Sequence, residues 1–203
     1  YQANIDLRLP WGNGVDLKVG QILTNVGAEG LNRNENPFYT RSIGFEIEPT
    51  HHTGVLASYQ ASDDVGLSFG VVNDDKTAVT NAEAGTGAAY LSGITYTLSD
   101  SAGALGGTQI SYQRVGDAGA DGAEQDNQYL GVSLPAGWPI EGVSYSFAWD
   151  IVEYDTSADS NIVGHYLSYA LNDKATLNAR WETGNVNIAA PAINYDGISA
   201  WTV

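Results

Sequence analysis

Two adjacent histidines close behind two glutamates are the first candidates for chemistry in this chain. His51 and His52 follow Glu46 and Glu48. Imidazole and carboxylate groups are common zinc ligands, but adjacent side chains of an extended segment point to opposite sides. The sequence therefore favours a solvated loop or a polar cluster facing a water-filled space over a metal centre.

An acidic segment, residues 116–127, is a second candidate ion site. Asp117, Asp121 and Glu124 supply carboxylate oxygens, which are the ligands that Ca²⁺ prefers. Their spacing differs from that of the helix-flanked loop that binds calcium tightly. Two interpretations stay open, a weak exposed Ca²⁺ site and an ordinary solvated loop, and we expect no other metal or cofactor.

Nothing in the sequence predicts catalysis. The chain has 203 residues, three histidines and no cysteine, so it contains no thiol nucleophile. None of the histidines belongs to a recognisable Ser/His/Asp motif. No glycine-rich run lies between a predicted strand and a predicted helix, as a nucleotide site would need. We therefore expect a protein that is not an enzyme.

A larger set of polar residues could line a hydrated space. Mixed charges are costly in a dry core, where each charge needs a partner, but they suit a water-filled lumen with a constriction. The candidate pore-lining and constriction residues are Asp6, Arg8, Asp16, Lys18, Glu29, Arg33, Arg41, Glu46, Glu48, His51, His52, Gln113, Asp150, Arg180 and Glu182. For those between residues 24 and 53, an ordinary charged external loop is the alternative.

These side chains must be positioned by strands, because apolar and small polar residues alternate along most of the chain. Alternation with a period of two puts an apolar stripe on one face of a strand and polar groups on the other. The pattern predicts strands at residues 3–9, 15–23, 54–61, 66–73, 89–98, 108–115, 128–134, 142–154, 164–171, 176–184 and 198–203.

The apolar stripe of these strands must meet protein or lipid. Residues predicted to face lipid include Tyr96, Tyr112, Val143, Tyr145, Phe147, Trp149, Ile151, Leu167, Tyr169 and Trp181. Aromatic residues near strand ends are typical of the girdles at membrane interfaces. Candidates for such girdles are Trp11, Tyr90, Tyr129, Trp138, Tyr154 and Trp201.

The connections between the predicted strands alternate between short and long. Short connections fall at residues 10–14, 62–65, 100–106, 135–141 and 172–175, and long ones at 24–53, 74–87, 116–127, 155–163 and 185–197. This alternation is typical of antiparallel, up-and-down outer-membrane barrels. We predict a single β-barrel domain over residues 1–203, in which residues 24–53 form a long loop folded into the lumen.

Charge and hydropathy agree with an envelope protein. The formal net charge is −16, from 24 acidic and 8 basic residues, which excludes binding to nucleic acid through a basic patch. The acidic balance predicts a mild preference for cations. No apolar run approaches the roughly 18 residues that a membrane-spanning helix needs. The chain opens at Tyr1 without a leader, as expected if an export signal has been removed or if the N-terminus is absent from this sequence.

Three segments carry a resemblance to a known family. They are GVDLKVGQ at residues 14–21, NPFYTRS at 36–42 and EPTHHTGVLASY at 48–59. Here the chain resembles the OmpL-like β-barrel porins of the porin-2 family. The resemblance implies an outer-membrane barrel that conducts small hydrophilic solutes and has no enzymatic activity. Family members are longer, and single-chain bacterial barrels have an even number of strands, so we expect the eleven strands to be part of a larger barrel.

The functional prediction is a porin of the bacterial outer membrane for the passive diffusion of small hydrophilic solutes and ions. Expected partners are outer-membrane lipid, lipopolysaccharide, the diffusing solutes and a second copy of the chain in a homo-oligomer. The alternative is a secreted or surface-exposed β-sandwich that binds, adheres or forms filaments. In that case the apolar faces of two sheets would pack together and the protein would need no detergent.

Overall fold

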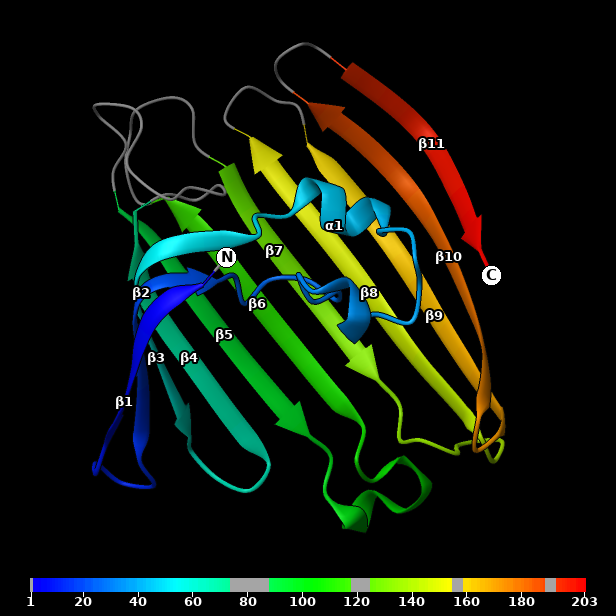
Figure 1. The fold of residues 1–203 in the computed structure, drawn as a ribbon, viewed down its shortest axis with the longest axis horizontal. Coiled ribbons are helices and arrows are strands. Elements are labelled where there is room, and N and C mark those ends of the chain that lie inside the picture. Colours follow the sequence, from blue (N-terminus) through cyan, green and yellow to red (C-terminus); the bar gives the residue numbers. More distant parts are fainter. Residues whose placement is uncertain (1, 74–87, 118–124, 155–158, 189–192) are drawn as a thin grey trace.

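The protein forms one curved, eleven-stranded antiparallel sheet in which every strand pairs with its neighbours along the chain (Figure 1). The computed structural model describes residues 2–73, 88–117, 125–154, 159–188 and 193–203. The strands are β1 Ala3–Leu9, β2 Val15–Leu23, β3 His51–Gln60, β4 Val65–Val72, β5 Ala89–Thr97, β6 Gln109–Asp117, β7 Gln125–Ser133, β8 Val143–Tyr154, β9 Ser160–Asn172, β10 Ala175–Ile188 and β11 Ile193–Thr202. This confirms the predicted fold class, all-β with antiparallel up-and-down strands.

The sheet is a bent wall whose two edge strands do not meet. Among the described residues, β1 and β11 form no pair with each other, so the wall is open on one side. Figure 1 shows the connection between β2 and β3 crossing the concave side of this wall. It carries a short 3₁₀ turn, η1 Arg33–Glu35, and one short helix, α1 Ile43–Ile47. We call residues 24–50 the inner loop, and the face that they cross the inner face.

Most predicted strands match the structure closely, but five of them were predicted too short at the end beside the long connections. The observed strands extend three to five residues further there in β3, β7, β9, β10 and β11. The added residues include polar ones on both faces, such as Gln125, Asn127 and Asn185. Hydrophobic alternation therefore does not mark these ends, although the backbone ladder continues through them.

The outer face of the sheet is apolar and open. Large side chains that point away from the inner loop remain exposed, such as Ile5 (65% exposed), Phe69 (56%) and Leu177 (51%). No second layer of described residues covers them. The surface that would form the buried core of a sandwich is thus turned outward over the whole width of the wall.

The inner face changes character along the strands. Toward the long connections, Ile22, Leu56, Leu91 and Val115 form a buried apolar cluster with Val26 of the inner loop. Toward the short connections, the inner positions carry mainly hydroxyl and amide side chains and charged pairs.

Among the girdle candidates whose side chains the structure describes, which do not include Tyr154, one was assigned to the wrong face. Tyr129 was expected in an outer girdle, but it faces inward and is 8% exposed within the apolar cluster. Its neighbours across the strands, Gln113 and Asp150, belong to the inner face.

Among the described residues, no helix has the length and apolar character needed to span a membrane.

Candidate functional site: the inner loop and its anchor

The inner loop is held against the wall by a buried ion-pair network centred on Arg180 of β10. The Arg180 guanidinium lies 2.7 Å from a Glu29 oxygen of the loop and 3.0 Å from a Glu182 oxygen of its own strand. All three side chains are at most 3% exposed. Alternation along β10 places Arg180 and Glu182 on the same inward face. A buried charge needs such partners, so the loop supplies a carboxylate that the arginine requires.

Arg180 also binds the backbone of the loop. It donates hydrogen bonds to the carbonyl oxygens of Thr40 (3.1 Å) and Arg41 (2.7 Å) and to the Thr40 hydroxyl (3.2 Å). Its guanidinium carbon lies 5.0 Å from the ring centre of Phe38, within cation–π range. A single arginine thus fixes the segment 38–41 in register with the wall.

Glu182 fixes the start of helix α1. One of its oxygens accepts hydrogen bonds from the backbone N–H groups of Ile43 (2.7 Å) and Gly44 (3.3 Å). The Ser42 hydroxyl accepts from the N–H of Phe45 at 3.0 Å. The first N–H groups of a helix have no partner inside the helix, and here the wall and the N-cap serine provide the acceptors.

Two further carboxylates meet beneath α1. A methyl group added to Gly44 would overlap the Asp150 carboxylate and would contact that of Glu48, so only a glycine lets the helix come this close. Burial raises the pKa of Glu48 well above its ordinary value, and the neighbouring charges of Asp150, Glu29 and Glu182 raise it further. The anchor therefore contains a carboxyl group that favours its protonated form.

Arg41 adds a second cation to the anchor. It lies 3.6 Å from Glu29 and donates to the carbonyl oxygens of Gly30 (2.7 Å) and Leu31. Its guanidinium also stacks over the ring of Phe45, 4.1 Å from the ring centre. These contacts join the first half of the inner loop to its second half.

The structure brings six predicted constriction residues into this anchor rather than into open water. They are enclosed between the loop and β8–β10, and they are Glu29, Arg41, Glu48, Asp150, Arg180 and Glu182. Their direct role in lining a pore stays a prediction. The sequence pattern gave their inward direction on β8 and β10, but it gave no signal that they pair with each other.

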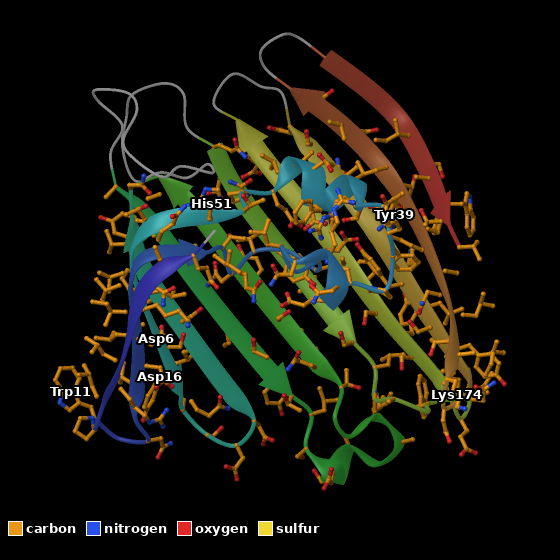
Figure 2. The ribbon with its side chains drawn as sticks, viewed as in Figure 1. Asp6, Trp11, Asp16, Tyr39, His51 and Lys174 are labelled. Carbon is orange, nitrogen blue, oxygen red and sulfur yellow. The ribbon has the colours of Figure 1, made fainter. Side chains whose placement is uncertain are left out.

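Four predicted residues line the inner face at the other side of the wall. Asp6 pairs with Lys18 at 3.0 Å, and Arg8 pairs with Asp16 at 2.7 Å. These ion pairs join β1 to β2 and are about half exposed. Figure 2 shows Asp6 and Asp16 on these two strands, well away from the helix.

The remaining predicted residues are dispersed. Arg33 lies over the ring of Tyr39, and Glu46 is exposed on α1. His51 starts β3 beside the Thr50 hydroxyl, 2.9 Å away, whereas His52 is fully buried. Gln113 faces inward near the middle of the wall. The two histidines therefore do not converge on one centre.

A family model decides the relationship of the chain. The model described as "Putative beta-barrel porin-2, OmpL-like" matches residues 1–200. The chain belongs to this porin-2 family. No curated protein and no solved structure gives a significant match. Membership of the family and the up-and-down sheet together identify an outer-membrane type of β-barrel, in which strands cross the bilayer.

In this porin-2 chain, all ten residues predicted to face lipid point to the outer face. On β8 they run from Val143 to Ile151, which is nine residues. A tilted strand needs about 9–11 residues to cross the hydrocarbon layer. The outer face carries no charged side chain along this stretch of β8, as contact with lipid requires.

The apolar outer face of this porin-2 chain ends in polar side chains beside the long connections, and we call this end of the face its upper edge. Arg114 pairs with Asp126, and Gln128 accepts from the Tyr112 hydroxyl at 2.9 Å and donates to Glu153 at 3.1 Å. These groups lie on the outer face next to the ends that carry the long connections. Such a change from apolar to charged side chains is typical of the level of lipid headgroups.

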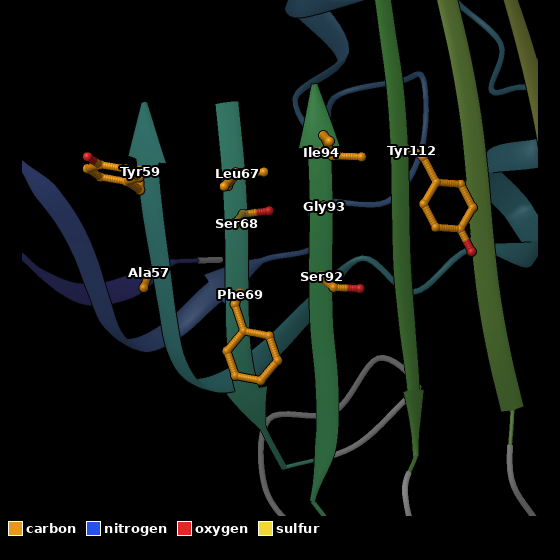
Figure 3. Close-up of a pocket in the computed structure, with 9 residues that line it drawn as sticks. All are labelled: Ala57, Tyr59, Leu67, Ser68, Phe69, Ser92, Gly93, Ile94 and Tyr112. Atoms are coloured by element: carbon orange, nitrogen blue, oxygen red, sulfur yellow. The ribbon is translucent and has the colours of Figure 1, made fainter. Parts of the chain in front are cut away.

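A hollow of about 450 Å³ lies on the outer face of β3–β6 (Figure 3). The small side chains of Ala57 and Ser92 form its floor, and Tyr59, Phe69 and Tyr112 surround it. Its apolar lining faces the same side as the lipid-facing residues. The hollow of this porin-2 chain is therefore apolar and lies outside the concave space.

The described residues of this porin-2 chain contain no group of three or more His, Cys, Asp or Glu side chains arranged to hold a metal ion. Of the candidate calcium ligands, Asp121 and Glu124 lie outside the described residues, as does the side chain of Asp117. The weak Ca²⁺ site at residues 116–127 therefore stays a prediction.

Proposed function

We propose that the protein is a passive diffusion porin of the bacterial outer membrane. One observation supports this most directly: the same wall is apolar on its outer face and polar on much of its inner face, and the inner loop is fixed across the inner face. An apolar outer face belongs against lipid acyl chains, and hydroxyl, amide and charged groups belong against water.

The inner loop acts as the constriction of this porin. It occupies part of the concave space, and its buried ion pairs hold it at a fixed distance from β8–β10. A fixed loop narrows the lumen without closing and opening it at random. Small hydrophilic solutes and ions then pass through the space between the loop and the wall of β1–β6.

The proposed partners follow from the two faces. Lipid acyl chains cover the apolar band, and lipopolysaccharide lies beside the polar upper edge at Arg114, Asp126 and Glu153. A homo-oligomer would bury part of the same outer face. The sandwich alternative requires a second sheet over this face, and the described residues place none there.

Conductance of the full-length protein in planar lipid bilayers tests the proposal. The folded protein should insert and give discrete, voltage-tolerant current steps in salt solution. A heat-unfolded sample at the same concentration is the control and should give none. A full-length, folded and inserted protein without conductance would overturn the proposal. A protein that stays monodisperse in the absence of detergent would favour the sandwich instead.

A further inference from the structure

The inner wall between the two charged regions is neutral. Among the described side chains, β3–β7 place no Asp, Glu, Lys or Arg on the inner face. Between the apolar cluster and the short connections, this wall carries hydroxyl and amide groups, those of Ser58, Gln60, Ser68, Thr95 and Gln113. The strong negative charge of the whole chain is therefore not a property of this part of the wall.

A groove of about 360 Å³ follows these neutral side chains. Asp16 is the one acidic residue in its lining, and that carboxylate is already paired with Arg8 at 2.7 Å. Small-molecule sites commonly enclose about 300–1,000 Å³. The groove thus has the size of a ligand site, but it offers no unpaired charge to an ion.

Three polar side chains converge over Gly93, which lines this groove. A methyl group on Gly93 would overlap the Ser68 hydroxyl of β4 and would press against Asn25 of the inner loop and Gln113 of β6. The Asn25 amide donates to the Ser92 carbonyl oxygen at 3.3 Å and to the Ser68 hydroxyl at 3.4 Å. The glycine leaves room for these groups, which come from three separate segments.

Two acceptors at this place are unused. The side-chain carbonyl oxygens of Asn25 and Gln113 are buried and have no hydrogen-bond partner among the described residues. Buried polar atoms normally have a partner. Because these two oxygens are enclosed, a ligand meets the other polar atoms in the lining of the groove. A ligand hydroxyl can donate to or accept from such hydroxyls and amides, which belong to Ser58, Gln60, Ser68, Thr95 and Gln113.

We propose that the groove around Gly93 is a binding subsite for an uncharged, polyhydroxylated solute such as a single sugar ring. This proposal rests on the porin function. A sugar exchanges hydrogen bonds with water for hydrogen bonds with amides and hydroxyls. An ion of either sign would lose hydration without meeting an opposite charge. The subsite therefore selects neutral polyols over charged solutes of the same size.

Block of the ion current by glucose tests the subsite in the full-length protein. Gln113→Leu replaces the amide side chain with an apolar one of similar size. The Gln113 oxygen has no hydrogen-bond partner among the described residues, so the variant should still fold. Loss of about one ligand hydrogen bond should raise the half-blocking glucose concentration about tenfold. The control is Ser168→Ala, which removes an inner-face hydroxyl on β9, away from the groove. Its half-blocking concentration should match that of the unchanged protein.

Charged sugars of the same ring size test the chemistry of the ligand. Glucuronate and glucosamine should block the current more weakly than glucose. Stronger block by glucosamine, unaffected by Gln113→Leu, would show a cation site and overturn the subsite. A conducting protein that glucose does not block would overturn the subsite and leave the porin function intact. A protein without conductance would overturn both.

Discussion

The anchor of the inner loop can be tested by replacing Arg180 with methionine. This change keeps a long, flexible side chain but removes the positive charge, and Glu29 and Glu182 remain buried without it. It also removes the hydrogen bonds to Thr40 and Arg41. The loop should then leave the wall, because its position depends on these contacts.

The expected magnitude follows from burial. Removing one partner of a buried ion pair costs about 3–5 kcal/mol. A change of about 1.4 kcal/mol is tenfold in an equilibrium constant, so the attached state of the loop loses a factor of roughly a hundred to a few thousand. The fraction of attached loop in Arg180→Lys should lie between that of the unchanged protein and that of Arg180→Met. Lysine keeps the charge but not the planar set of five donors.

Single-channel recording and limited proteolysis measure this loss. The current of Arg180→Met should become noisy or larger, and the segment between β2 and β3 should become sensitive to protease in detergent. The matched control is Arg8→Met, which breaks a half-exposed ion pair worth at most about 1 kcal/mol. If the folded Arg180→Met protein kept the current, noise and protease resistance of the unchanged protein, the anchor would be refuted.

Three further changes test the faces, the buried carboxyl and the close approach of α1. Phe147→Arg puts a charge on the outer face and should destabilise the folded state in lipid vesicles by about 2–4 kcal/mol in urea titrations. Ser146→Arg, one residue away and facing inward, should have a much smaller effect. Because the pKa of Glu48 is raised when the loop is attached, its contribution to attachment is complete below about pH 4.5, the ordinary value. It is lost as the pH rises through the raised pKa. Current noise should therefore increase with pH, and Glu48→Gln should flatten this dependence; an unchanged pH profile would contradict the assignment. Gly44→Ala should loosen the loop because its methyl group would overlap Asp150, and equal protease resistance would argue against that contact.

The strands could be predicted wherever one face meets lipid and the other meets water. The bounds of β1 and β2 match the prediction, because β1 alternates from end to end and β2 alternates from Val15 to Val19. The upper ends of β9 and β10 lie beyond the apolar band, where the outward residues Asn161 and Asn185 are polar. There Ile162 and Val186 are buried on the inner face, and the Ser160 hydroxyl bonds the backbone of Asn187. The outer face lacks the apolar residues that mark a strand in the sequence.

The inward direction of the anchor residues could be predicted, but their partners could not. Alternation alone places Arg180 and Glu182 inward. Their pairing with Glu29, Thr40 and Ile43 joins segments about 140 residues apart in the chain. Such contacts depend on how the inner loop crosses the concave face. The alternating pattern contains no information on that path, nor on the convergence of side chains over a glycine.

The pairing of each strand only with its chain neighbours makes the wall modular. Adding or deleting a hairpin outside β2–β10 alters no register among these strands, because each strand pairs only with its chain neighbours. The circumference of a barrel grows roughly in proportion to its strand number. Evolution, or a protein engineer, can therefore change the width of such a channel in two-strand steps outside β2–β10 while the inner loop and its contacts on β8–β10 stay as they are.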